Sequence, residues 1–409
     1  MVFKTLIFIT ILWPGFSFAS DNCPTKLSRS ADVLSCAEAA SPEVQSATLE
    51  LNVAKQQLPA ATQWKNPEFT AETFFSTADT SSSETDFGLG IPIELGGKRG
   101  ARGAVASGAI AQAEARLLIA RSSVRSATLL KMHRLRQIAH EQEIIEESIG
   151  TYTKLISTYQ RRPQLSPEQE VSVAVFRLSK SEYELKRTEV LEELSALENF
   201  FLTTVGRSVS SLIEALPESP KRWPTLPTPN ELTNAPELLL ADAQLKIAQA
   251  ELALAKSDRW PTLTLGPSLK MQRGPTSNEQ MLGVNLSLPL PVFNSNQAGQ
   301  AAASASLQLS EANRRFKLQA AERDRSERVA NYQRSIKALA ESLSHEEIEK
   351  RHAQVEKLFL RGVAPSSLVI EAHRSFLELE RIRNERELKA LESLLTIYLI
   401  DGKVLEVEL

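Results

Sequence analysis

The sequence has few of the residues that define the small cysteine-rich and nucleic-acid-binding classes. Only 2 of the 409 residues are cysteine, which argues against a zinc-finger array and a disulfide-rich scaffold. Aromatic residues make up 6% and the formal net charge is −3, so the chain is not a basic nucleic-acid binder. Beyond the first 20 residues it also lacks any apolar run long enough for a transmembrane helix, which needs about 20 residues.

In place of these residues the chain has the composition of long helices. Alanine, leucine, glutamate, lysine and arginine together make up nearly half of it. This proportion is typical of coiled coils and long helical proteins. We therefore expect an elongated molecule instead of two or three globular domains.

The N-terminus has the pattern of a secretory signal peptide over residues 1–19. Lys4 precedes a short apolar run at residues 6–13, and Pro14-Gly15 ends it. Small residues at Ser17 and Ala19 then fit cleavage before residue 20. A buried N-terminal segment is the alternative. On the signal-peptide interpretation the mature protein is exported.

Two cysteines follow the expected cleavage site. Cys23 and Cys36 would lie in an oxidising compartment, where a disulfide between them is possible and two free thiols are the alternative. The residues before Cys23 lack the apolar-then-small pattern of lipoprotein processing, so we do not expect lipidation.

The chain contains an internal duplication. A shift of 194 residues aligns residues 42–70 with residues 236–264 and gives nine identities, beginning with Pro42-Glu43 on Pro236-Glu237. The matched apolar residues are separated by alternating steps of four and three, which is the spacing of a coiled-coil helix. The matched pairs are Ala47/Ala241, Leu51/Leu245, Ala54/Ala248, Leu58/Leu252, Ala61/Ala255, Pro67/Pro261 and Thr70/Thr264.

Each copy continues with two alternating strands and then a long helix. Apolar residues alternate at about 68–95 in the first copy and about 262–292 in the second, each time around a polar loop. A helical pattern follows at about 101–161 and about 298–360, on the order of 90 Å each. Short tips at about 162–167 and 361–365 precede return helices that end near Gly206 and Gly402, where glycine suits a helix C-cap.

These patterns predict the domain organisation. Repeat 1 covers residues 20–206, a proline-rich linker covers 207–230, and repeat 2 covers 231–409. The fold class is mainly α with a membrane β-barrel portion, built from a duplicated helix–β-hairpin–long helix–helix unit. A return helix plus the next copy's first helix has about 60 residues, so we expect these two to stack end to end beside one long helix.

The four strands have the length and alternation of transmembrane β-strands, which need 9–11 residues. Trp64 and Trp260 lie at the helix-proximal ends of the two hairpins, where aromatic residues of a membrane barrel meet the interface. A soluble β-domain is the alternative. Because open strand edges are not tolerated in lipid, four strands per chain require an oligomer. A dimer would give 8 strands with a filled interior, and a trimer 12 strands with room for a pore.

The order of these elements resembles the TolC family of outer membrane efflux proteins. The strand-to-helix passages GIPIELGGKRGAR (residues 90–102) and VNLSLPLPVFNSNQAG (residues 284–299) are most similar to its heavy-metal (cobalt–zinc–cadmium) branch. The resemblance covers essentially the whole mature chain. It implies a homotrimer with a 12-stranded barrel in the outer membrane of a Gram-negative bacterium and an α-helical tunnel in the periplasm. It also implies a periplasmic membrane-fusion adaptor and an inner-membrane, proton-driven RND pump as partners.

The resemblance also assigns roles to residues at the two tips. Leu165, Ser166, Arg361, Gly362 and Val363 would contact the adaptor. Glu371 falls where the family has an inner acidic ring at the tunnel mouth, and Leu368 occupies a second, normally acidic position of that ring. Three Glu371 carboxylates around a narrow mouth would favour cations. A solvated helix carboxylate is the alternative.

The sequence has no strong catalytic or metal-binding motif. The pairs His133/His140 and His345/His352 are each seven residues apart, about 10 Å along one helix, which is too far to chelate one ion. We expect no enzyme activity, no cofactor and no nucleic acid partner. The pattern favours a passive exit duct for heavy-metal cations. The alternatives are a TolC-like duct for drugs or other organic compounds, and a periplasmic coiled-coil adaptor or scaffold.

Overall fold

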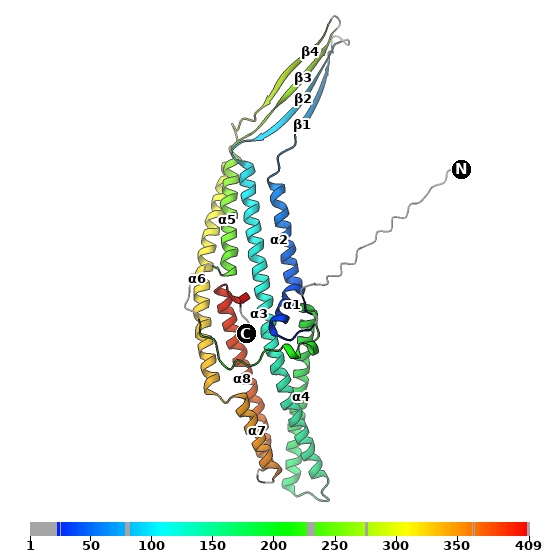
Figure 1. The fold of residues 1–409 in the computed structure, drawn as a ribbon, viewed down its shortest axis with the longest axis vertical. Helices are drawn as coiled ribbons and strands as arrows, with labels where there is room; N and C mark the ends of the chain where they lie inside the picture. Colours follow the sequence, from blue (N-terminus) through cyan, green and yellow to red (C-terminus); the bar gives the residue numbers. More distant parts are fainter. Residues whose placement is uncertain are drawn as a thin grey trace, which may run out of the picture.

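The chain folds into an elongated molecule with a β-sheet at one end and two helical tips at the other (Figure 1). The computed structural model describes residues 23–24, 26–77, 82–226, 234–274, 277–361, 363 and 365–406. The expected signal peptide, residues 1–19, lies outside the described residues, as do Gly362 and the end of the expected linker at 227–230.

The first copy has the predicted order of elements. Its helices are α1 (Ser30–Ala40), α2 (Pro42–Ala61), α3 (Lys98–Gln160) and α4 (Pro167–Thr204), and its strands are β1 (Glu68–Phe75) and β2 (Ser83–Glu94). Helix α1 precedes the region in which the copies match and was not expected. Gly96 and Gly97 have φ of 74° and 77°, in the left-handed region that glycine adopts without strain, and they turn the chain from β2 into α3.

The second copy departs from the prediction at two places. Its elements are α5 (Pro236–Ser257), β3 (Thr262–Arg273), β4 (Asn278–Ser287), α6 (Gln297–Glu341), α7 (His345–Leu360) and α8 (Ser366–Ile400). The expected strand to residue 292 ends at Ser287, because Pro289 and Pro291 have no N–H to donate to a sheet.

The second long helix, predicted as one element over 298–360, is broken between α6 and α7. Ser344 starts α7 with a capping box, in which its Oγ accepts a hydrogen bond from Glu347 N at 3.2 Å. Arg383 of α8 occupies the break, where its Nη1 donates to Leu339 O at 3.2 Å, Leu343 O at 2.8 Å and Ser342 Oγ at 2.6 Å. Two of these bonds satisfy carbonyls at the break: Leu339 O in the last turn of α6, which also accepts from Ser342 Oγ, and Leu343 O in the connecting segment.

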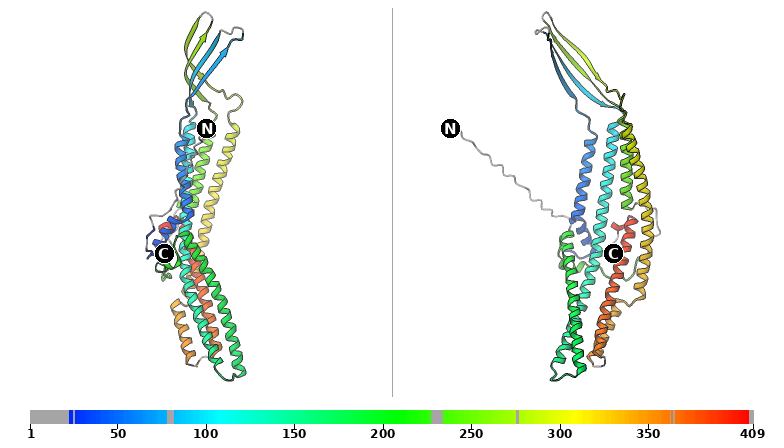
Figure 2. Two further views of the ribbon diagram at one scale, coloured as in Figure 1. Left: turned by 90° about the vertical axis from the view of Figure 1, so that its right-hand side faces the viewer. Right: turned by 180° about the vertical axis from the view of Figure 1, so that it is seen from behind.

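Short helices do stack end to end along the long ones, but in different pairs from those predicted. Figures 1 and 2 show α2 above α4 on one side of α3, and α5 above α8 on the other. Helices α4 (38 residues) and α5 (22 residues) have the predicted combined length, yet they lie on opposite sides of α3. The reason is that the linker after α4, with short helices at Val209–Ser211 and Ile213–Ala215, crosses the body. Its Pro217 O accepts from Arg136 of α3, and its Pro224 O accepts from Tyr332 of α6.

The four strands form one antiparallel sheet in the order β1-β2-β3-β4. The pairing of β2 with β3 joins the two copies, with Ile91 opposite Leu265. Gly266 allows this close approach, since a Cβ there would lie 1.6 Å from Leu89 O. Within the described residues, β1 and β4 each pair along one side, so the sheet has two free edges.

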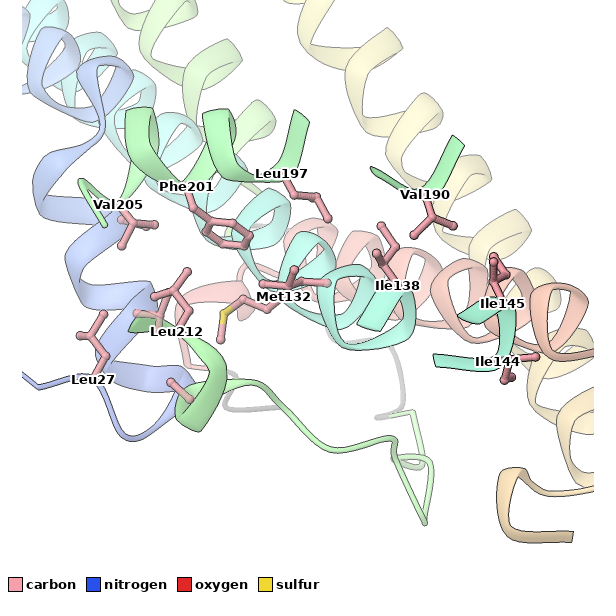
Figure 3. Close-up of a cluster of buried hydrophobic side chains, with 14 of the residues drawn as sticks. Leu27, Met132, Ile138, Ile144, Ile145, Val190, Leu197, Phe201, Val205 and Leu212 are labelled. Carbon is pink, nitrogen blue, oxygen red and sulfur yellow. The ribbon is translucent and has the colours of Figure 1, made fainter. Parts of the chain in front are cut away.

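The largest apolar core among the described residues packs α3 against α4 and extends to α1 and α2 (Figure 3). Val190, Leu197 and Phe201 of α4 point toward Met132 and Ile138 of α3. Further along α3, Tyr152 packs against Phe176 and Tyr183 of α4, with ring centroids 6.5 and 5.6 Å apart.

Among the described residues, no helix has both the length and the apolar character needed to cross a lipid bilayer.

Candidate functional site

The sheet has one apolar and one polar face. The pairs Phe69–Leu89, Ile91–Leu265 and Leu265–Leu286 lie on the same face, because directly paired residues of neighbouring strands share a face. Exposure on this face is high, as Phe69 is 67% and Leu282 88% exposed. The opposite face carries polar and small residues, among them Thr70, Gly88, Ser268, Gly283 and an ion pair between Lys270 and Glu84.

Trp64 and Trp260 lie at the junction of sheet and helices, and both are more than half exposed. The guanidinium of Arg99 stacks over Trp64 at 4.5 Å from the ring centroid, and Arg99 Nε donates to Thr62 O. Trp260 packs on Gly96, where a Cβ would meet its ring at 2.4 Å. Two indole rings and the guanidinium of Arg99 therefore lie at this end of the sheet.

The two tips lie side by side at the far end of the molecule (Figures 1 and 2). In the first tip, Ser166 caps α4 and exchanges hydrogen bonds with Gln169, while Leu165 is half-buried. In the second tip, Arg361 is exposed and Val363 is 70% exposed. The predicted contact residue Gly362 lies outside the described residues.

Leu368 and Glu371 share one face of the first turns of α8. Leu368 is 52% exposed and Glu371 is exposed, whereas Val369 and His373 on the opposite face are buried. Next to them, Arg374 Nη2 donates to Glu182 Oε2 of α4 at 2.8 Å, which links the two copies near the tips. Both predicted gate residues are thus on a surface that the single chain leaves open.

Cys23 and Cys36 form a disulfide. The bond holds the segment before α1 on the core, because Cys36 is fully buried there beside Leu27 and Val33.

Polar residues are buried between α3 and α8, and the sequence did not reveal them. Glu141 of α3 accepts hydrogen bonds from Arg134 Nη1 at 2.7 Å and Asn384 Nδ2 at 2.8 Å. Burial alone would raise the pKa of Glu387, but the nearby imidazoles of His133 and His345, the charge of Arg136 and a hydrogen bond from Ser219 hold it well below its usual range. Burial lowers the pKa of His133, which lies beside Glu387.

All five histidines of the chain lie on α3, α7 and α8. His140 of α3 lies across from His345 of α7, with ring centroids 6.3 Å apart. His352 of α7 lies against His373 of α8, with centroids 4.7 Å apart. The spacing of seven on each helix was visible in the sequence. The prediction from it was incomplete, because it considered pairs along one helix and not pairs between helices.

Comparison with known proteins agrees with these features. Residues 229–403, less than half of the chain, match the model of the family described as "Outer membrane efflux protein". The proteins of this family are passive channels of the outer membrane and not enzymes. The predicted family resemblance is confirmed.

Individual relatives agree with this class. The cobalt-zinc-cadmium resistance protein CzcC of Cupriavidus metallidurans is 25% identical over 275 residues, which span 64% of this chain and 63% of CzcC. The structure of CusC matches with a TM-score of 0.72 at 15% identity over 92% of both chains. The CmeC outer membrane channel of Campylobacter jejuni matches with a TM-score of 0.70 at 14% identity, over 92% of this chain and 86% of CmeC. At these identities the two structures show a shared fold.

Proposed function

We propose that three copies of this chain form the outer-membrane exit duct of a tripartite, proton-driven (RND-type) efflux system, and that the duct exports heavy-metal cations. The duct is passive. The inner-membrane pump supplies the energy, a periplasmic adaptor engages the tips, and the helices around the tips move outward to open the tunnel.

The two-faced sheet with free edges is the observation that carries this proposal. An apolar face suits lipid and a polar face suits a water-filled lumen, as in the strands of outer-membrane barrels. The free edges of β1 and β4 must be paired inside lipid, since no water is available there to satisfy their backbone groups. Three copies provide 12 strands, enough for a barrel with an open interior.

The exposed tips support the roles proposed for the adaptor and the gate. Leu165, Ser166, Arg361 and Val363 form the described part of the surface that would meet the adaptor. In a trimer, Leu368 and Glu371 of each copy would face the narrow end of the tunnel, and three carboxylates there would attract cations. The metal cargo is inferred from the relative CzcC, which is named for resistance to cobalt, zinc and cadmium.

The assembly can be tested by cross-linking across the proposed subunit boundary. Thr70→Cys on β1 and Asn285→Cys on β4 place thiols on the polar face of the two edge strands, and the native cysteines are already paired. With a bifunctional maleimide, the double variant extracted from outer membranes should yield covalent trimers. Each single variant is the control and should not exceed a cross-linked dimer. A monomeric double variant in the soluble fraction would contradict the duct and favour the scaffold alternative.

The gate can be tested by conductance in planar bilayers. Glu371→Gln removes one carboxylate per copy and is expected to lower the preference for cations over anions. Glu378→Gln is the matched control, because it lies two turns further along the same exposed side of α8, about 10 Å away. Equal effects of the two variants would remove the assignment of Glu371.

A further inference from the structure

Three side chains from three helices converge near the start of α7. His140 Nε2 of α3 lies 3.8 Å from Glu380 Oε1 of α8, and His345 Nδ1 of α7 lies 2.6 Å from the same oxygen. One ligand atom of each residue lies within 4.8 Å of the others. In a tetrahedral zinc site with bonds of about 2.0–2.1 Å, ligand atoms are about 3.3 Å apart. Side-chain shifts of about 1.5 Å or less would therefore bring the three atoms onto one ion.

Glu380 is buried without the donors that a carboxylate needs. It is 1% exposed, and neither of its oxygens accepts a hydrogen bond of good geometry from any of the described residues, although His345 Nδ1 is close enough for an ion pair. A buried carboxylate in this condition is costly unless a cation compensates it. In the structure the imidazole of His345 provides this compensation, and a divalent cation bound between the two imidazoles and the carboxylate would replace it.

The second nitrogen of each imidazole faces another carboxylate. His140 Nδ1 lies 3.9 Å from Glu143 Oε2, and His345 Nε2 lies 3.8 Å from Glu387 Oε2. Metal-binding histidines typically have this arrangement, because the outer carboxylate fixes the ring and its tautomer. Glu387 is itself held by Arg136 and by Ser219 Oγ at 2.7 Å, so it orients His345 and is not a free ligand.

A cavity of about 390 Å³ adjoins the three residues. Its lining includes His140, His345 and Glu380 together with the acidic residues Glu346 and Glu349, and Arg136 is the one basic residue among those that line it. The cavity gives a hydrated cation a way in and leaves room for a water as fourth ligand.

We propose that His140, His345 and Glu380 bind one divalent transition cation of the zinc class. The donor set of two imidazoles and one carboxylate with an open position suits zinc or cobalt(II). Magnesium and calcium prefer sites made wholly of oxygen, and copper(I) prefers thiolate or thioether ligands, so neither kind fits. The site lies within one chain and does not depend on the proposed export function.

Occupancy would fix α7 in place. His345 is the first residue of α7, directly after the break from α6, and the cation would tie it to α3 of the first copy and to α8. Without the cation, the contacts that hold this break include the hydrogen bonds of Arg383 and the ion pair of His345 with Glu380. The cation therefore acts as a clamp between the two copies in the half nearer the tips.

The test is zinc titration of the purified, chelator-treated trimer in detergent, without a histidine tag. The chain should bind one zinc ion, and the cobalt(II) form should show the visible absorption of a tetrahedral site. His140→Asn and Glu380→Gln should each weaken binding by more than about 100-fold, since even outer partners of metal ligands account for 10–100-fold. His140 is partly exposed, so its replacement leaves folding least disturbed. His352→Asn, which removes one imidazole from the same helix as His345, should retain wild-type affinity.

Hydrogen exchange provides the second measurement. Zinc should slow amide exchange over residues 345–352 in the wild type and have no effect in His140→Asn. Absence of zinc binding to the wild type, or an unchanged affinity in His140→Asn, would overturn the site. Neither result would affect the duct, which is tested by trimer formation and conductance.

Discussion

His373 should make the half of the molecule nearer the tips less stable as pH falls. The side chain is 1% exposed in α8, where Nδ1 lies 2.9 Å from Ser148 Oγ and 3.3 Å from His352 Nε2. Burial lowers the pKa of His373 to about 4; the neighbouring His352 adds to this effect, and Glu356 opposes it. In the unfolded chain the pKa of histidine is about 6.5.

The sign and size of the effect follow from linkage. Between pH 6.5 and 4 the unfolded state binds a proton that the folded state does not, so stability is full above pH 6.5 and is lost as pH falls toward 4. The maximum loss is about 3 kcal/mol, and at pH 5 the loss is about 2 kcal/mol. That corresponds to a decrease of roughly 30-fold in the protection of amides that exchange by local unfolding of this region.

Native-state hydrogen exchange of the detergent-solubilised protein measures this loss directly. Protection factors, corrected for the intrinsic pH dependence of exchange, should fall roughly 30-fold more in the wild type than in His373→Gln over residues 367–380 between pH 7.5 and 5. His373→Gln does not titrate and should show a much smaller decrease, while α5, which contains no histidine, serves as an internal control. The reasoning is refuted if the wild type and His373→Gln respond equally to pH.

Other features of the fold give shorter predictions. Cys23→Ser combined with Cys36→Ala should lower the stability of the α1 region by roughly 3 kcal/mol, because the bond closes a loop with a sequence separation of 13; unchanged exchange in α1 would contradict this. Arg383→Ala leaves Leu343 O without this donor and Leu339 O with only Ser342 Oγ of its two side-chain donors, so it should destabilise the α6–α7 break by about 1–3 kcal/mol, seen as faster exchange over 338–350 and no change in the sheet. Gly266→Val should abolish membrane-inserted trimers, since its side chain would collide with Leu89 O; heat-modifiable trimers at the wild-type level would exclude this role of Gly266.

Helices and strands were predictable from the sequence where a periodic pattern of apolar residues is long or occurs in both copies. The shift of 194 residues identified α2 and α5, and the two alternating hairpins predicted four strands. The first long helix was predicted within three residues of its observed start at Lys98 and one of its end at Gln160.

The rest depended on local chemistry and on contacts between helices. The break after Glu341 was indicated by the capping pattern of Ser344 and Glu347, but the surrounding helical periodicity obscured it. The stacking of α2 on α4 depends on where the proline-rich linker crosses the body, which chain length alone does not determine. The cluster of His140, His345 and Glu380 requires the register of three separate helices, and no spacing along the sequence encodes that register.

The most direct test of the proposed export function is the metal tolerance of a bacterium that lacks this chain. Growth of the deletion strain in graded zinc, cobalt, cadmium and nickel should be compared with that of the same strain carrying the intact gene or the Glu371→Gln variant. We expect tolerance to at least one of these cations to fall in the deletion strain and to return with the intact gene, while tolerance to organic antimicrobials stays the same. Unchanged tolerance to all four cations would contradict heavy-metal export, and a loss confined to organic compounds would assign the duct to them.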